Sequence, residues 1–188
     1  MIKAILEYFN KLWYNLLRIG EVKVMDMEKN NKISILTVAN YVIYYLNQKG
    51  QKISQLKLQK LLYFIEAYNM ACGNPPMFSE QFKAYTYGPL CFEVYDYYKI
   101  YGGEDILEYD DIDDATKETL KPYTEIIDAV CDTFGDLTAA QLVNLTHEED
   151  SPWSKIWQQN GGKNSSDLGI IPKDLTCEWF RKRFTDAA

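Results

Sequence analysis

Apolar side chains that recur every three or four residues constrain the fold of this chain more than any other feature. In residues 35–46 and 58–68 they have the spacing that places them along one side of an α-helix. Ser54 is a predicted N-cap, and Gly50 and Gly73 follow predicted helix ends. Similar cap and stop signals recur through the rest of the chain. The sequence therefore predicts a mainly α fold, a single-domain helical bundle of six or seven helices.

A minor β element is expected between the second and third predicted helices. Residues 77–87 alternate loosely between apolar and polar side chains and run into Gly88-Pro89, a turn dipeptide. We expect a short extended segment or hairpin there, followed by a helix over residues 91–101. Later, Ser151-Pro152 has the order of an N-cap and a first-turn proline, so another helix is expected to begin at Trp153.

The chain is predicted to have four segments. Residues 1–24 form an amphipathic helix that packs on the body or a partner, or touches a membrane surface. Residues 25–33 are a linker, 34–160 the main domain, and 161–188 a loop with a C-terminal helix packed on it. No apolar run in the first segment approaches the roughly 20 residues of a membrane span. A translation start at Met25 would place residues 1–24 outside the native protein.

The cysteines argue against a zinc site or a disulfide framework. Their positions are Cys72, Cys91, Cys131 and Cys177. No pair has the short spacing with which two thiolates grip one metal ion, so we expect reduced thiols in a cytoplasmic protein. We expect no cofactor.

Charge is distributed unevenly along the chain. Residues 1–60 carry ten Lys and Arg against four Asp and Glu, a net charge of +6. Residues 104–136 carry twelve acids against two lysines, a net charge of −10. Nucleic-acid binding needs clustered cations, so no nucleic-acid partner is expected. The acidic region is either a solvated face or a surface that attracts a basic protein.

The best local candidate for an active site is LTHEEDSPW, residues 145–153, which holds the chain's single histidine. On a helix, His147 and Asp150 would share a face, as a base and its orienter or as two metal ligands. However, the chain has no HExxH, GxSxG or P-loop pattern. We therefore predict no catalytic or metal residue. The imidazole is expected to hydrogen-bond a backbone group at a helix corner, with Trp153 packed beside it.

Tyrosines are dense just before the acidic region: six fall within residues 85–101. Tyr97 and Tyr98 cannot both face the core of one helix if Tyr95 and Tyr101 do, so part of this ring surface is expected to be exposed. Tyrosine suits half-wet protein interfaces. The predicted partner-binding residues are Tyr97, Tyr98, Tyr101, Asp105, Asp110, Asp111 and, on the N-terminal helix, Trp13.

Several motifs, in order, resemble the Panacea, or SocA-like, antitoxin domain, which also occurs in prophage-associated proteins. They are KLQKLLY at 57–63, YGP at 87–89 followed by Val94-Tyr95, and Thr146-His147 followed by Pro152-Trp153. The resemblance covers about residues 34–160. We expect the matching residues to serve the fold; they are Lys57, Lys60, Tyr63, Tyr87, Gly88, Pro89, Tyr95, His147, Pro152 and Trp153.

The resemblance implies an antitoxin, encoded beside a toxin and neutralising it by direct protein–protein binding. One alternative within the family is an adaptor that delivers the toxin to a cellular protease. A second alternative, from a different class, is a small hydrolase or metal enzyme centred on His147. A DNA-binding autoregulator is disfavoured by the acidic balance.

Overall fold

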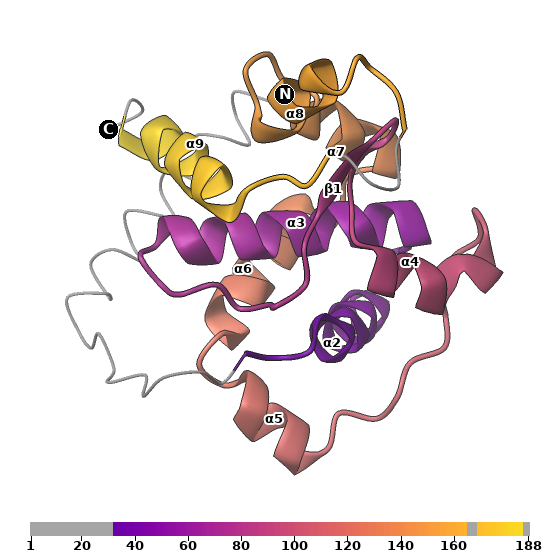
Figure 1. Cartoon of the computed structure of the whole chain (residues 1–188). Helices are drawn as coiled ribbons and strands as arrows, with labels where there is room; N and C mark the ends of the chain where they lie inside the picture. Colours follow the sequence, from indigo (N-terminus) through magenta and orange to yellow (C-terminus); the bar gives the residue numbers. More distant parts are fainter. Residues whose placement is uncertain (1–31, 165–168, 186–188) are drawn as a thin grey trace.

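The structure, a computed structural model, describes residues 32–164 and 169–185 (Figure 1). Its elements in chain order are α2 (Ile35–Gln48), α3 (Gln55–Ala71), β1 (Lys83–Tyr85), β2 (Gly88–Leu90), α4 (Phe92–Tyr98), the 3-10 helix η1 (Lys99–Tyr101), α5 (Asp114–Leu120), α6 (Thr124–Phe134), α7 (Ala139–Thr146), α8 (Pro152–Gln159) and α9 (Lys173–Thr185). The predicted mainly α class with a minor β element is confirmed, with eight α-helices in the described ranges.

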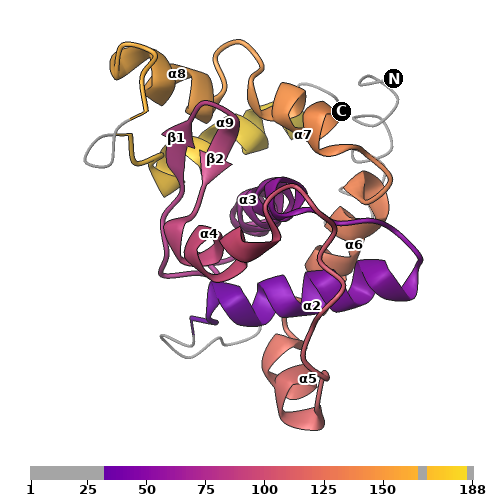
Figure 2. The ribbon, with the colours of Figure 1, turned by 90° about the vertical axis from the view of Figure 1, so that its right-hand side faces the viewer.

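Helix α3 is the centre of the fold. Every residue of it except Leu56 is buried. Figure 2 looks down its axis and shows α2, α4, α6, α7 and the hairpin arranged around it. A helix with neighbours on all sides has no solvent-exposed face. The side of α3 opposite its apolar stripe is therefore also buried.

The apolar stripe of residues 58–68 predicts that the polar residues of α3 point outward, and this prediction is wrong. Lys57, Gln59, Lys60 and Glu66 are all buried. Each is instead hydrogen-bonded to a remote segment, because a buried polar group without a partner is costly. Gln59, for example, accepts from Cys91 N at 2.8 Å and donates to Cys91 O at 3.0 Å, which fixes the start of α4 against α3.

Two acids of α6 bind side chains of α2. Tyr41 Oη donates to Asp128 Oδ1 at 2.9 Å, and Tyr45 Oη donates to Asp132 Oδ1 at 2.9 Å. Lys49 also pairs with Asp132. The acidic region of the sequence therefore contains carboxylates that join α6 to α2. Before α6, Asp114 and Glu118 pair with lysines three residues later in the chain, whereas Glu108 and Asp110 form no ion pair within the described residues.

The hairpin is shifted by two residues from the predicted turn. Strands β1 and β2 pair antiparallel with Tyr85 opposite Gly88, so Thr86 and Tyr87 form the turn and Gly88-Pro89 begins the second strand. On the other side of β1, Ile171 N donates to Phe82 O at 2.8 Å. The segment before α9 thus extends the small sheet and leads the chain back to α3.

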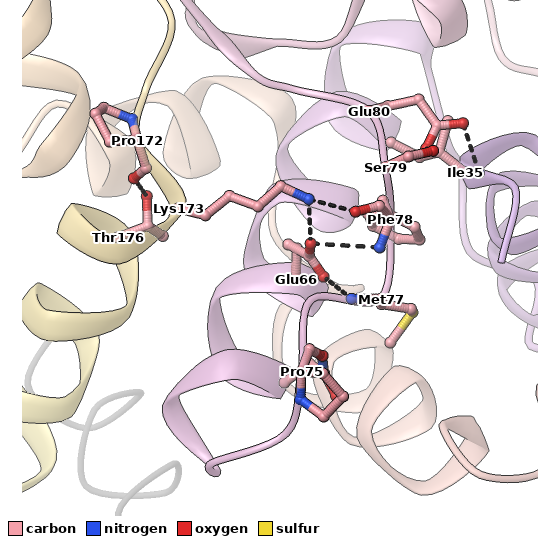
Figure 3. Close-up of polar contacts among 11 residues, drawn as sticks. Ile35, Glu66, Pro75, Met77, Phe78, Ser79, Glu80, Pro172, Lys173 and Thr176 are labelled. Atoms are coloured by element: carbon pink, nitrogen blue, oxygen red, sulfur yellow. Dashed lines mark hydrogen bonds and ion pairs between the residues drawn. The ribbon is translucent and has the colours of Figure 1, made fainter. Parts of the chain in front are cut away.

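A buried ion pair fastens α9 to α3 (Figure 3). Lys173 Nζ, at the start of α9, donates to Glu66 Oε1 at 2.7 Å and also to Phe78 O. Glu66 further accepts from Met77 N at 2.8 Å. Burial raises the pKa of Glu66, and Lys173 opposes that shift. The helix starts at Lys173, so Asp174 lies in its first turn.

Three further observations concern the predicted segments, a membrane span and the cysteines. The N-terminal helix over 1–24, most of the linker, and Trp13 lie outside the described residues. Within residues 32–164 and 169–185, no helix combines the length and apolar character needed to cross a membrane. The four cysteines are unpaired.

Candidate partner-binding groove and the motif centre

The residues of the sequence motifs converge on one buried cluster, here called the motif centre: Lys60, Gly88, Pro89, Thr146, His147 and Trp153. Lys60, from α3, is 1% exposed, and its Nζ donates to Pro89 O at 2.7 Å. Burial lowers the pKa of Lys60 to about 7. One ammonium, held by one carbonyl, thus ties the hairpin to the central helix.

Gly88 allows three elements to meet at the motif centre. A Cβ on this residue would lie 2.5 Å from Thr146 Oγ1 of α7 and 2.8 Å from Lys60 Cε of α3. Its φ of +93° is also a conformation that L side chains rarely adopt. Only glycine therefore fits this contact between β2, α3 and α7.

His147 is held mainly by ring stacking. Its ring lies 3.6 Å from that of Trp153, with 8° between the planes. Trp153 Nε1 in turn donates to Tyr85 O of β1 at 2.8 Å. His147 Nε2 is buried and has no hydrogen-bond partner among the described residues, so this nitrogen does not make the predicted bond to the backbone. The helix corner is confirmed, but stacking fixes the ring.

The surroundings of His147 do not favour acid–base chemistry. Burial, assisted by the charge of Lys60, lowers its pKa to about 4, so the imidazole is neutral and weakly basic at pH 7. Helix α7 ends at Thr146 and Asp150 has φ +59°, so His147 and Asp150 do not share a helix face. Across the described ranges, no group of three His, Cys, Asp or Glu side chains is placed to hold a metal ion.

The remaining motif residues lie outside this centre. Lys57 Nζ donates to Lys52 O at 2.7 Å and to Gly135 O, joining α3 to the end of α6. Tyr63 packs edge-on against Phe82, with ring centroids 5.4 Å apart. Pro152 follows the Ser151 cap at the start of α8, as predicted. Tyr87 and Tyr95 are 65% and 40% exposed, so neither contributes a fully buried ring.

The predicted partner-binding tyrosines line a different site, here called the tyrosine groove, of about 310 Å³. Its lining residues are Asn40, Tyr97, Tyr98, Ile100, Tyr101, Glu108, Tyr109 and Asp110. Tyr97 and Ile100 are 58% and 81% exposed at its rim, whereas Tyr98 is 5% exposed and forms its floor. Tyr98 thus supports the exposed rings from below and contributes little exposed surface of its own.

The rings of the groove are packed against one another. Tyr97 lies edge-on to Tyr98 with centroids 4.9 Å apart, and Tyr101 is tilted against Tyr98 at 6.4 Å. Tyr101 Oη donates to Glu108 Oε2 at 3.1 Å. This arrangement follows from the tight turn of η1, which brings Tyr98 and Tyr101 onto one side.

The acidic wall of the groove is fixed in position by α2. The Asn40 side chain binds both backbone groups of Asp110: its Nδ2 donates to Asp110 O at 3.0 Å, and its Oδ1 accepts from Asp110 N at 2.8 Å. Asn47 Nδ2 donates to Ile106 O at 3.2 Å, and Ile106 N donates to Ile53 O at 2.8 Å. The segment is irregular but anchored, so binding would not have to order it.

The other predicted acids lie outside the groove lining. Asp105 is half-buried and pairs with Lys52 at 3.4 Å. Asp111 is exposed. Sequence reasoning did not identify Asn40, Ile100, Glu108 or Tyr109 as site residues. The apolar residues within the acidic run, Leu107 and Tyr109, were the available signal, since a purely solvated loop has no need of them.

Comparison with known proteins identifies the family. The model of the antitoxin SocA-like Panacea domain matches residues 58–154. The chain belongs to this family. Antitoxin SocA of Caulobacter vibrioides (strain NA1000 / CB15N) is 31% identical over 141 residues, which cover 71% of this chain and 74% of that protein. No solved structure matches the chain.

Both sites fall largely within the matched Panacea domain. Residues 58–154 contain the whole motif centre and all of the tyrosine groove except Asn40, which α2 contributes. The two sites lie on different neighbours of α3: the motif centre on β2, α7 and α8, and the groove on α4, η1 and α2. The Panacea domain of this chain therefore offers a buried centre and, separately, an exposed concave surface.

Proposed function

We propose that this protein is an antitoxin that neutralises a cognate protein toxin by binding it directly through the tyrosine groove. Membership of the SocA-like family and the name of the Caulobacter relative support an antitoxin role. The groove itself is the observation that supports this choice of surface: exposed apolar side chains surround a concave site whose carboxylates form no ion pair within the described residues. Concave sites of this composition favour recognition.

The motif centre is a poorer binding surface. Lys60 and Thr146 are buried, and Gly88 is in close contact with both. A partner could reach them only after α7 or the hairpin had moved. The groove needs no such rearrangement, because its rim residues Tyr97 and Ile100 are already exposed. Pre-formed surfaces lose less entropy on binding.

The charge of the groove indicates a basic partner. Glu108 and Asp110 line the site, and the exposed carboxylates of Glu104 and Asp111 lie in the same segment. Complementary fields accelerate the encounter with a cationic surface and disfavour an acidic one. We infer that the toxin presents Lys or Arg side chains around an apolar anchor, and that both proteins act in the cytoplasm.

Co-expression with the product of the neighbouring gene tests this proposal. We expect that product to be toxic alone, tolerated with this protein, and recovered with it in a stoichiometric complex. Replacing Tyr97 and Ile100 together by Ala should abolish protection while the protein remains folded. The matched control is Tyr87→Ala, which removes a comparably exposed tyrosine from the hairpin turn. A harmless neighbour that does not co-purify would refute the antitoxin role.

The same cells distinguish sequestration from delivery to a protease. Sequestration leaves the toxin level steady or raised when the antitoxin is present, because the complex protects both chains. Delivery to a protease lowers the toxin level when the antitoxin is present. Deleting that protease would then lengthen the half-life of the toxin. Immunoblots of the toxin after a translation block report both quantities, and we expect the steady level.

We propose no catalytic role for His147, because a neutral imidazole stacked on Trp153 is suited to packing. His147→Gln approximates the size of the ring and removes its basicity. Protection from the toxin should survive this change in any variant that remains folded. Loss of protection by a folded His147→Gln protein that still binds the toxin would instead indicate chemistry at this residue.

A further inference from the structure

Four tyrosine rings and two carboxylates line the tyrosine groove, and no cation of the described residues lies among them. The lining rings are Tyr97, Tyr98, Tyr101 and Tyr109, and the carboxylates are Glu108 and Asp110. We propose that the groove is a receptor for one arginine side chain presented by a protein partner. This proposal rests on the proposed function only in taking that partner to be the toxin.

The chain itself completes the same combination of groups at two other places. Arg183 lies over the Trp179 ring, 4.3 Å from its centroid, and pairs with Glu148. Lys49 lies over the Tyr45 ring at 4.2 Å and pairs with Asp132. In both, a cation is held between an aromatic face and a carboxylate. The tyrosine groove has the aromatic faces and the carboxylates, so an external cation would complete it in the same way.

The carboxylates of the groove have no internal cation to neutralise them. Among the described residues, neither Glu108 nor Asp110 forms an ion pair with a Lys or Arg side chain. The cations nearest in sequence are engaged elsewhere, Lys99 with Asp96 at 2.9 Å and Lys117 with Asp114 at 2.9 Å. The negative charge of the groove is therefore available to attract a cation from an external partner.

Arginine fits this site better than lysine or a larger ligand. Its planar guanidinium stacks on aromatic rings and donates hydrogen bonds to a carboxylate at the same time. Tyr98 provides a buried ring as the floor, and Glu108 and Asp110 provide acceptors on one wall. A volume of about 310 Å³ is at the lower end of the range for ligand pockets, ~300–1,000 Å³. Such a site has room for one long side chain.

The groove is also rigid enough to select one side chain. Asp110 is clasped by Asn40, and Gln48 Nε2 donates to Tyr109 Oη at 3.2 Å. Tyr109 additionally packs edge-on against Tyr44, with centroids 5.7 Å apart. The wall formed by residues 108–110 is thus held by α2, independently of any ligand.

Nuclear magnetic resonance of the full-length protein with labelled tyrosine rings tests the proposal. The probe is N-acetyl-arginine methylamide, and the control is the citrulline analogue, which has nearly the same shape and no charge. We expect saturable shifts of the Tyr97 and Tyr101 ring signals with the arginine probe, weakening as salt is added. The citrulline analogue should bind at least about tenfold more weakly, equivalent to ~1.4 kcal/mol. No saturable shift, or equal shifts with both probes, overturns the proposal.

A matched pair of double variants locates the effect. Glu108→Gln with Asp110→Asn removes two charges from the groove and should weaken the arginine probe by at least about tenfold. Glu104→Gln with Asp111→Asn removes two charges from the same segment outside the groove and should change it about twofold or less. Equal losses would mean that net charge alone attracts the probe, which contradicts a built site.

The outcome is separable from that of the proposed function. If the protein protects cells from the toxin but does not bind the probe, the arginine site is wrong and the antitoxin role stands. If the probe binds but the neighbouring gene product is harmless and does not co-purify, the site stands and its partner is another arginine-bearing protein.

Discussion

The motif centre and the tyrosine groove both combine aromatic rings with charged side chains, and they differ in where their polar groups point. In the motif centre, Lys60 donates to Pro89 O and Trp153 donates to Tyr85 O, so these donors are already hydrogen-bonded within the protein. In the groove, Glu108 and Asp110 have no cation within the described residues. We infer that the motif residues assemble the scaffold, and we propose that recognition depends on residues outside the motifs.

The largest effect is expected from Gly88→Ala. The added Cβ would overlap Thr146 Oγ1 at 2.5 Å and force a positive φ on alanine. We expect a loss of about 3 kcal/mol in the free energy of unfolding, measured by urea denaturation. Gly161→Ala is the control, since its φ is +68° but no atom lies within 4 Å, and it should cost about 1 kcal/mol. Similar losses in both variants would remove the steric argument for the motif centre.

A second, nearly as large effect is expected from Lys173→Met, which leaves Glu66 buried without its cation. We expect a loss of about 2 kcal/mol at pH 7. Lys121→Met, which breaks an exposed pair with Glu118, should cost less than about 0.5 kcal/mol.

The deficit of Lys173→Met should depend on pH with a defined sign. Burial raises the pKa of Glu66, and removing Lys173 raises it further. An acid with a raised pKa in the folded state favours folding at low pH and loses that contribution as the pH rises through its pKa. The deficit should therefore be smallest in acid and grow toward neutral pH. A deficit that grew on acidification would show that the pair does not control Glu66.

Lys60→Met tests the role of the motif centre in stability, because it removes the buried cation of that site. Burial lowers the pKa of Lys60 to about 7, while in the unfolded chain it is near 10.5. A lysine with a lowered pKa contributes stability that is present above its unfolded pKa and is lost as the pH falls toward about 7. The stability of the wild type relative to Lys60→Met should rise by about 2 kcal/mol from pH 7 to pH 9. Equal pH profiles would place the ammonium in solvent.

The smallest effects on stability are expected outside the buried centre. Glu104→Gln with Asp111→Asn should change the free energy of unfolding by less than about 0.5 kcal/mol. The same variant should slow association with the toxin about threefold at low salt, with little change in dissociation, because it alters only the steering field. Surface plasmon resonance at two salt concentrations measures both rates. A faster dissociation without slower association would place these acids in the contact itself.

Much of the fold could be predicted because helix signals are local. The caps at Ser54, Thr138 and Ser151 and the apolar periodicity of α2 are contained in short windows of sequence, and the structure has helices at each. The orientation of Lys60 and Glu66 could not be predicted in this way. Their burial depends on Pro89 O and Lys173, which are 29 and 107 residues away.

The groove was predictable only in part for the same reason. An excess of tyrosines next to acids suggested an exposed ring surface, and Tyr97 is exposed. The opposite wall depends on Asn40, which clasps Asp110 from 70 residues away. The shift of the hairpin turn to Thr86-Tyr87 likewise follows from the contact of Gly88 with α3 and α7, which dipeptide preferences do not contain.

Site-specific photo-crosslinking tests directly whether the partner binds at the tyrosine groove or beside the motif centre. A benzophenone amino acid replaces either Tyr97, at the groove, or Tyr87, on the hairpin beside the motif centre; the two are 58% and 65% exposed. Each variant is co-expressed with the neighbouring toxin and irradiated. We expect a covalent complex from position 97 and none from position 87. Crosslinking from position 87 alone would place the partner on the hairpin face and contradict the separation of scaffold from recognition surface.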